Sequence, residues 1–450
     1  MKKISRKKDG RFLLLLFVVH TVFFLVALFC KRIYMGDSFE YVYEALNIRD
    51  HWWFYCGNPA LPFVPEYLTL RPPLYPLVLS GVYLFVVNNW VVIFLQNLIS
   101  IFNIYCLRDT IRKLGYKRRY DYLLMAFILL YPAQFVHTNT IAPDLLLQTS
   151  VLLYFRYFVL LLKKQDWRYA MYMSLALIGG MFIKPVLYPF CWVHSLLLLA
   201  VWAYVRKDLL RMSMAGLLPL CVLMAYMGLN YDRTGKAHFT STQSFNAVYY
   251  YYFYFIDKKG PEYAQQFLTE ERAKIAAVPN FKDRYDYANA RGVTLLKDNF
   301  AAYMPYHIVK GTRMLIDPGK GEWDMFTGHT TLGQLYTKPA KSFSQTIKED
   351  GWAGLDDYFV KNPSFMLAMI VLLFNLIRLG GLALFCFSSK IDWRIRAFVV
   401  CIIGYFCMTT GPIANTRYFM PLYLICIGAA TLGFQKLLRR KKNKAIIVSN

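Results

Sequence analysis

The sequence predicts an all-α polytopic membrane protein with about ten transmembrane helices, because long apolar runs recur along almost the whole chain. Of its 450 residues, 57% are hydrophobic and only 18% are charged. The runs extend from Phe12 to Leu432, and a soluble protein of this size could not bury them all. We expect membrane-spanning helices near residues 12–30, 88–107, 120–136, 144–162, 169–184, 186–205, 212–229, 362–386, 395–410 and 417–435.

The formal charge of +25 lies mainly in short loops and in the two tails. The basic loops 108–119, 163–168, 206–211 and 388–396 should be cytoplasmic together with both termini, because cytoplasmic loops are enriched in Lys and Arg. Nucleic acid is therefore not an expected partner, although the chain is basic. The first apolar run follows a basic segment, as in a signal peptide, but no small-residue cleavage site comes after the run. We therefore interpret it as a retained helix.

The same rule decides how the ambiguous run Pro72 to Val87 should lie. If this run crossed the membrane, the strongly basic loop 108–119 would be outside. We therefore expect an interfacial helix within the first outer loop, residues 31–87. Residues 1–229 then form a transmembrane module, 230–361 an extracytoplasmic loop domain, 362–435 the C-terminal transmembrane helices and 436–450 a basic cytoplasmic tail. The segment 230–361 carries 17 Lys plus Arg against 15 Asp plus Glu and should be mostly helical.

Asp37 follows the first helix closely, in the stretch GDSFEY. A carboxylate at the membrane surface can be partly desolvated, which raises its pKa and makes a general base possible. The alternative is that Asp37 or Gly36 caps a helix and Glu40 completes a capping box.

Three cations and a second acid should face the same outer side. Arg71 precedes Pro-Pro and Lys184 lies between two apolar runs, while Arg417 opens the last helix. Each could bind an anion such as a phosphate, or could anchor the chain at lipid headgroups. Asp144 begins the helix after the second outer loop, where capping is the alternative role. The run Tyr249 to Tyr254 could stack against sugars or form an amphipathic interfacial helix.

The sequence contains no HExxH, EF-hand, P-loop, GxGxxG or CxxC motif, so metal and nucleotide chemistry have no support from it. No predicted cytoplasmic segment is long enough to form a nucleotide-sugar-binding domain. Any activated sugar donor should then be carried by a lipid and used outside.

Several short motifs follow one another in a fixed order. GDSFEY comes directly after the first helix, then RPPLYPLVL, IAPDLLLQ, a Lys-Pro pair and finally RYFMP, all on the predicted outer side. Together they resemble membrane glycosyltransferases of the GT-C superfamily, especially the bacterial branch similar to protein O-mannosyltransferases and lipid A aminoarabinose transferases. The resemblance covers residues 1–229 best and the last helices weakly, and no motif matches within 230–361.

The resemblance implies that Asp37 is the catalytic base and that Tyr41 completes a D-x-x-x-Y pattern in the substrate site. Arg71 stands where members of the superfamily have Lys or His, and Ser38 stands where many have Glu. The implied reaction is hexosyl or pentosyl transfer from a polyprenyl-phosphate sugar to a hydroxyl of a lipid, glycan or protein, without a cofactor. Arg71, Asp144, Lys184 and Arg417 would bind substrate.

The implied location is a bacterial cytoplasmic (inner) membrane, with the active site on the extracytoplasmic side. Two other functions stay open on the sequence. One is a lipid-linked glycan flippase or transporter, and the other is an O-antigen ligase or polymerase type of enzyme.

Overall fold

The computed structural model describes residues 2–205, 208–330 and 343–448. Among these residues the protein is all-helical and contains no β-strand, as the sequence predicts. Arg206 and Lys207 of one basic loop, residues 331–342 of the predicted loop domain and residues 449–450 of the tail lie outside the described residues.

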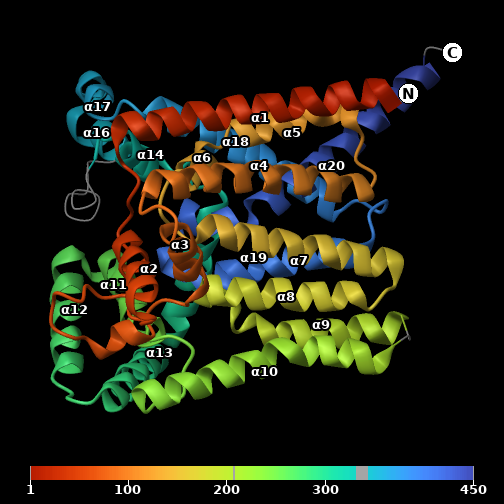
Figure 1. The fold of residues 1–450 in the computed structure, drawn as a ribbon. Helices are drawn as coiled ribbons and strands as arrows, with labels where there is room; N and C mark the ends of the chain where they lie inside the picture. The colour runs from red at the N-terminus through yellow and green to blue at the C-terminus, as the bar shows by residue number, and fades with distance from the viewer. Residues whose placement is uncertain (1, 206–207, 331–342, 449–450) are drawn as a thin grey trace.

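A bundle of roughly aligned helices makes up most of the molecule (Figure 1). Its helices are α1 (Lys2–Cys30), α4 (Asn89–Lys113), α5 (Asp121–Leu129), α6 (Pro132–Thr138), α7 (Asp144–Lys164), α8 (Arg168–Ile183), α9 (Phe190–Val205), α10 (Leu209–Thr234), α18 (Phe365–Cys386), α19 (Trp393–Thr410) and α20 (Thr416–Val448). All ten segments predicted to span the membrane are helical in whole or in large part. Seven helices in the described part of the chain are long and apolar enough to cross a membrane, and α8 and α9 are shorter apolar helices beside them.

The segment 120–136 is not one helix as predicted, because it breaks between α5 and α6 at Leu130 and Tyr131. Pro132 is the first residue of α6. A proline disfavours helical dihedral angles in the residue before it, and Tyr131 accordingly has φ −135° and ψ 79°. Apolar composition alone does not reveal this break.

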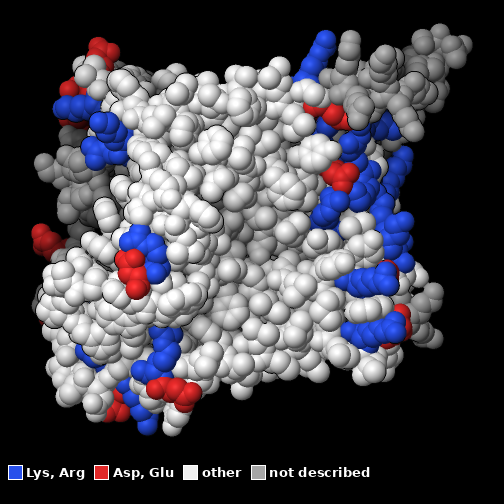
Figure 2. Space-filling view, in the orientation of Figure 1, with Lys and Arg blue, Asp and Glu red and all other residues white. Residues whose placement is uncertain are grey.

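The start of α1 and the end of α20 lie at one end of the bundle, together with the loops that join α4 to α5 and α7 to α8 (Figure 1). Figure 2 shows mainly Lys and Arg side chains at this end, with a few acidic side chains among them, whereas acidic and basic side chains are more evenly mixed at the opposite end. The flank between the two ends is almost free of charge in this view. This distribution is typical of an integral membrane protein whose basic loops share one side.

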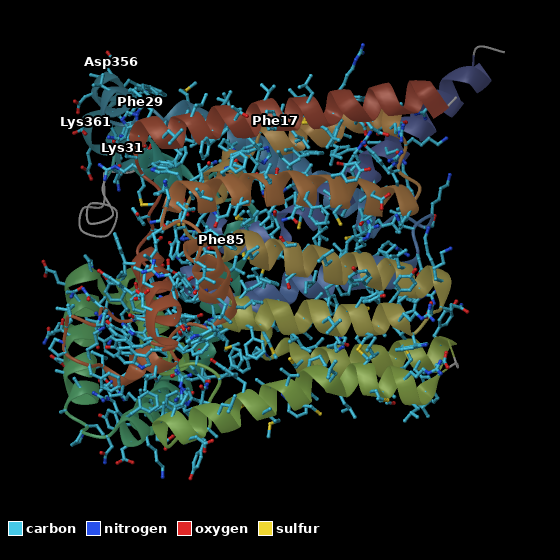
Figure 3. All side chains as sticks on the ribbon, viewed as in Figure 1. Phe17, Phe29, Lys31, Phe85, Asp356 and Lys361 are labelled. Atoms are coloured by element: carbon cyan, nitrogen blue, oxygen red, sulfur yellow. The ribbon has the colours of Figure 1, made fainter. Side chains whose placement is uncertain are left out.

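Large apolar side chains lie exposed along the flank of the bundle. Phe29 of α1 is 89% exposed and Phe85, which follows α3, is 91% exposed, and Phe17 projects from the same flank as Phe29 (Figure 3). The charged residues Lys31, Asp356 and Lys361 lie near one end of the molecule, close to Phe29. Exposed apolar surface of this extent is unfavourable in water and favourable in lipid.

The other helices gather at the end opposite the termini (Figure 1). They are α2 (Ser38–His51), α3 (Leu74–Tyr83), α11 (Thr242–Lys259), α12 (Pro261–Ala276), α13 (Phe281–Thr312), α14 (Lys320–Thr327), α16 (Phe343–Asp350) and α17 (Leu355–Lys361). With only ten residues, α3 extends about 15 Å, half the hydrocarbon thickness. The tyrosine-rich run lies on α11, and its Tyr251 and Tyr254 are buried in a small core shared with α12 and α13.

Two glycines let α18 and α20 pack closely against each other. A Cβ atom on Gly433 would collide with the carbonyl oxygen of Gly381, whereas one on Gly380 would meet nothing within 4 Å. We expect Gly433→Ala to destabilise the protein by about 1–3 kcal/mol, because the backbones must separate. Gly380→Ala on the same helix pair is the matched control and should unfold at the wild-type temperature or slightly above it. Equal melting temperatures of the two variants in detergent would contradict this prediction.

Candidate functional site

All six residues that the sequence singled out lie in one cluster of charges at the end of the bundle opposite the termini. Arg417, the second residue of α20, is at its centre. Its Nη1 and Nη2 donate to the two carboxylate oxygens of Asp37 at 2.9 and 2.8 Å, and its Nε donates to Asp144 at 2.7 Å. One guanidinium thus joins the loop after α1 to the start of α7.

The remaining predicted residues complete the cluster from two sides. Lys184, at the end of α8, donates to the other oxygen of Asp144 at 2.6 Å. Arg71 lies on the far side of Asp37, with Nη1 3.7 Å from Asp37 Oδ2. Its guanidinium carbon lies 5.2 Å from the centre of the Tyr41 ring, and Tyr41 is buried. Asp37 therefore has a cation on each side.

Short backbone and side-chain contacts explain how Asp37 and Asp144 come together although 107 positions separate them along the chain. Ser38 donates its hydroxyl to the carbonyl of Ile141 at 2.6 Å and accepts from the Met35 amide. The Ile141 amide in turn donates to the carbonyl of Ile33 at 2.8 Å. The chain on both sides of Asp37 is thereby attached next to the residues that lead into α7. Sequence analysis noted Ser38 only as a departure from the Asp-Glu pattern.

The structure does not contain the capping interactions that the sequence left open for Asp37, Glu40 and Asp144. Asp37 occupies the position before the first residue of α2, but its side chain makes no capping hydrogen bond. Glu40 makes no capping box either, because it accepts from Nε of Arg71 at 2.5 Å. Asp144 is the first residue of α7 and is fully buried against Arg417 and Lys184. Arg71, Lys184 and Arg417 likewise pair with carboxylates, which headgroup anchoring does not require.

The N-terminus of α20 is held by residues that the sequence reading did not select. Asn415 accepts through its side chain from the backbone amide of Arg417 at 3.0 Å. Thr416 lies 3.4 Å from Nε2 of the buried His137. Asn415 could have been recognised as a preferred residue before a helix start. His137 carried no such local signal, because its contact with Thr416 depends on how α6 and α20 pack.

Asp37 has a lowered pKa, which is the opposite of the shift expected from its position at the membrane surface. Burial raises the pKa of the carboxyl, but the positive charges of Arg417 and Arg71 lower it by more, so the pKa of Asp37 lies well below its usual range. Glu40 differs, because burial outweighs its pairing with Arg71 and raises its pKa. Asp37 is therefore ionised and a weak base while both arginines contact it.

The charges of this cluster balance. Three cations, Arg71, Lys184 and Arg417, face three carboxylates, Asp37, Glu40 and Asp144. The cluster remains open enough to be reached from solution, since the side chains of Arg71 and Glu40 are 19% and 30% exposed. Such a site can take up an anion by exchanging one carboxylate for it.

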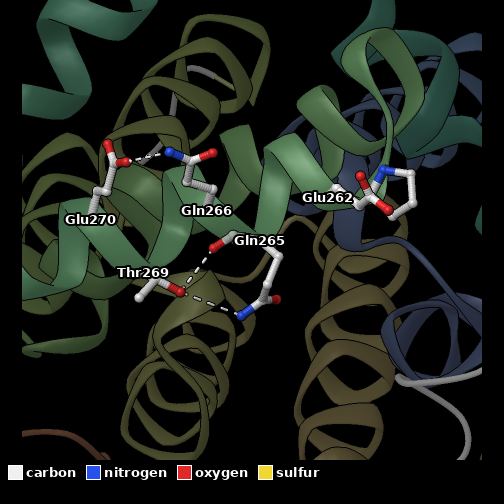
Figure 4. Close-up of a pocket in the computed structure, with 6 residues that line it drawn as sticks. Glu262, Gln265, Gln266, Thr269 and Glu270 are labelled. Carbon is white, nitrogen blue, oxygen red and sulfur yellow. Dashed lines mark hydrogen bonds between the residues drawn. The ribbon is translucent and has the colours of Figure 1, made fainter.

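A shallow depression on α12 is lined by Pro261, Glu262, Gln265, Gln266, Thr269 and Glu270 (Figure 4). It contains no cation and none of the six predicted residues. No group of three or more His, Cys, Asp or Glu side chains within the described ranges could hold a metal ion.

Comparison with known proteins does not assign the chain to a family. No protein-family model matches the sequence, and no curated protein matches it.

Glu44 is a further buried acid next to the cluster, one helical turn beyond Glu40 on α2. It is 2% exposed and its Oε2 has no hydrogen-bond partner. Burial raises the pKa of Glu44 well above its usual value, and the charges of Arg233 and Arg71 offset only part of this effect. The folded protein thus binds a proton here at a pH where the unfolded chain has already released it.

This raised pKa predicts the direction in which stability changes with pH. Between the unfolded and folded pKa values of Glu44, the folded state holds more protons, so wild-type stability should fall as pH rises, by up to about 1.4 kcal/mol per pH unit. Glu44→Gln cannot ionise and should remove this dependence, so the variant should exceed wild type in melting temperature on the alkaline side. Glu262→Gln on the surface of α12 is the control. Parallel melting curves for wild type and Glu44→Gln across the pH series would contradict the prediction.

Proposed function

We propose that this protein is an integral membrane glycosyltransferase of the GT-C type. It would transfer a hexosyl or pentosyl group from a polyprenyl-phosphate sugar to an acceptor hydroxyl on the extracytoplasmic side of a bacterial cytoplasmic membrane. The observation that carries the proposal is the ion cluster, in which Asp37 lies between Arg71 and Arg417. This arrangement places a carboxylate that can act as a base beside cations that can hold a departing phosphate.

The proposed topology has ten crossings, with α5 and α6 together forming one of them and α8 and α9 forming two more. The basic loops and both termini would be cytoplasmic by the positive-inside rule. The charge cluster lies at the opposite end of the bundle and would then be extracytoplasmic. Within residues 31–87, α3 would lie in the outer interface.

In the proposed reaction, Asp37 removes the proton from the acceptor hydroxyl as its oxygen attacks the anomeric carbon of the sugar. The new carbon–oxygen bond forms while the bond from the anomeric carbon to the phosphate oxygen breaks. Polyprenyl phosphate leaves with an additional negative charge, and the proton stays on Asp37 until it passes to solvent. Arg71, Lys184 and Arg417 would offset the developing charge, and such interactions are stronger in a poorly solvated site than in water.

The test is a panel of polyprenyl-phosphate sugars incubated with the purified protein in lipid nanodiscs. The proposal expects one donor to be consumed and free polyprenyl phosphate to appear. A flippase would instead move a lipid-linked glycan across proteoliposomes without consuming it. A ligase or polymerase of the O-antigen type should be more sensitive to alanine substitutions within 230–330 than to substitution of Asp37. Either of these outcomes would overturn the proposal.

A further inference from the structure

Arg417 has no free face for a second anion in this arrangement. The two terminal nitrogens of its guanidinium grip both oxygens of Asp37, and the third nitrogen donates to Asp144. A guanidinium binds a phosphate through the same bidentate, end-on hydrogen bonding. The Asp37 carboxylate therefore occupies the position where Arg417 could hold a phosphate oxygen pair.

Arg71 is arranged differently and offers a first contact. Both its Nε and Nη2 contact a single oxygen of Glu40 at 2.5 Å, and its Nη1 approaches Asp37 only to 3.7 Å. Its side chain is 19% exposed. A phosphate arriving beside Arg71 would thus reach the edge of the Asp37–Arg417 pair.

We propose that the phosphate of the donor displaces the Asp37 carboxylate from Arg417, and that this exchange converts Asp37 from a masked ion-pair partner into a competent base. The inference rests on the proposed function, since it takes the donor to be a polyprenyl phosphodiester. It also predicts an order of events in which the donor binds before the acceptor hydroxyl can be deprotonated.

The charge balance of the cluster explains why Asp37 takes up a proton when the phosphodiester binds. The cluster carries three cations and three carboxylates, so a bound phosphodiester leaves it with one excess negative charge. The Asp37 side chain is only 13% exposed, and a carboxylate that loses its guanidinium partner in such surroundings favours its neutral form. Taking up one proton on Asp37 restores neutrality. At neutral pH that proton would come from the acceptor hydroxyl, and under mildly acidic conditions it would come from water.

The test uses the methyl diester of a short-chain polyprenyl phosphate, whose single negative charge does not titrate under these conditions. Its binding to the full-length protein in nanodiscs is measured by calorimetry at mildly acidic pH, in two buffers with different ionisation enthalpies. We expect net proton uptake in wild type and none in Asp37→Asn. The Asp37→Asn variant should also bind the diester about tenfold or more tightly, because no carboxylate competes for Arg417. Asp257→Asn, which removes a surface partner of Lys310, should behave as wild type.

The wild-type protein supplies a second measurement that does not depend on the folding of any variant. Since binding takes up a proton, the affinity for the diester should rise as the pH falls. Diester binding that is independent of pH and releases or absorbs no proton would overturn the inference, while sugar transfer by the same preparation would leave the proposed function standing. Absence of both diester binding and sugar transfer would overturn the proposed function itself.

Discussion

Sugar transfer by Asp37→Asn is expected to fall by about 10²- to 10⁴-fold, the usual contribution of a general base. Asn has nearly the same shape, and its amide oxygen can still accept from Arg417, which keeps its second partner Asp144. The fold should therefore persist while the proton acceptor is lost. The measurement is the initial rate with the donor that the panel identifies, together with the melting temperature in detergent.

The matched control for this experiment is Asp257→Asn, which changes an acid on α11 that pairs with Lys310 outside the cluster. Its rate should equal that of wild type. Undiminished transfer by Asp37→Asn would exclude Asp37 as the base. A rate loss accompanied by a large drop in melting temperature would instead assign Asp37 a structural role.

Arg417→Gln is expected to have the largest effect on stability, a loss of about 3–5 kcal/mol. The substitution removes three hydrogen bonds to two carboxylates at once, and Asp144 is fully buried, so its remaining charge keeps only Lys184 as a partner. An unpaired charge away from water is costly. Denaturation in mixed micelles measures the change in the free energy of unfolding.

Lys361→Gln provides the comparison, because Lys361 pairs with Asp357 where the two side chains are 69% and 65% exposed. The free energy of unfolding of that variant should fall by less than about 1 kcal/mol, because exposed ion pairs usually contribute no more than this. Combining Arg417→Gln with Asp37→Asn should cost less than the sum of the two single substitutions, since the double variant no longer leaves Asp37 charged without its partner. Equal decreases in the free energy of unfolding for Arg417→Gln and Lys361→Gln would contradict the stabilising role of Arg417 in the cluster.

The helices were largely predictable from the sequence because apolar runs long enough to span a bilayer have few other uses. That residues 72–87 do not cross stays a prediction, since α3 is a short apolar helix, as α8 and α9 are. The exception was the segment 120–136, where Pro132 interrupts the helix within an otherwise continuous apolar run. Apolar composition predicts burial in lipid or protein, but backbone restrictions decide whether the helix continues.

The candidate site was predictable only as a set of residue types that share one side of the membrane. Asp37, Arg71, Asp144, Lys184 and Arg417 could be selected because charges next to apolar runs are costly and usually have a purpose. Whether they perform the proposed chemistry stays a prediction. Local sequence favoured capping for Asp37 and Asp144 and did not separate anchoring from anion binding for Arg71, and only the contacts between distant segments distinguish these roles.

By itself, then, the sequence determined that this chain is a helical membrane protein, and it predicted basic loops on one side of the membrane and a group of acids and cations on the other. Tertiary structure alone decided which charges pair, that Ser38 and Ile141 bring Asp37 close to Asp144, and that the pKa of Asp37 is lowered. The reason is that the protonation of a carboxyl depends on the cations within a few ångströms of it. Here Arg417 approaches Asp37 from 380 positions away along the chain.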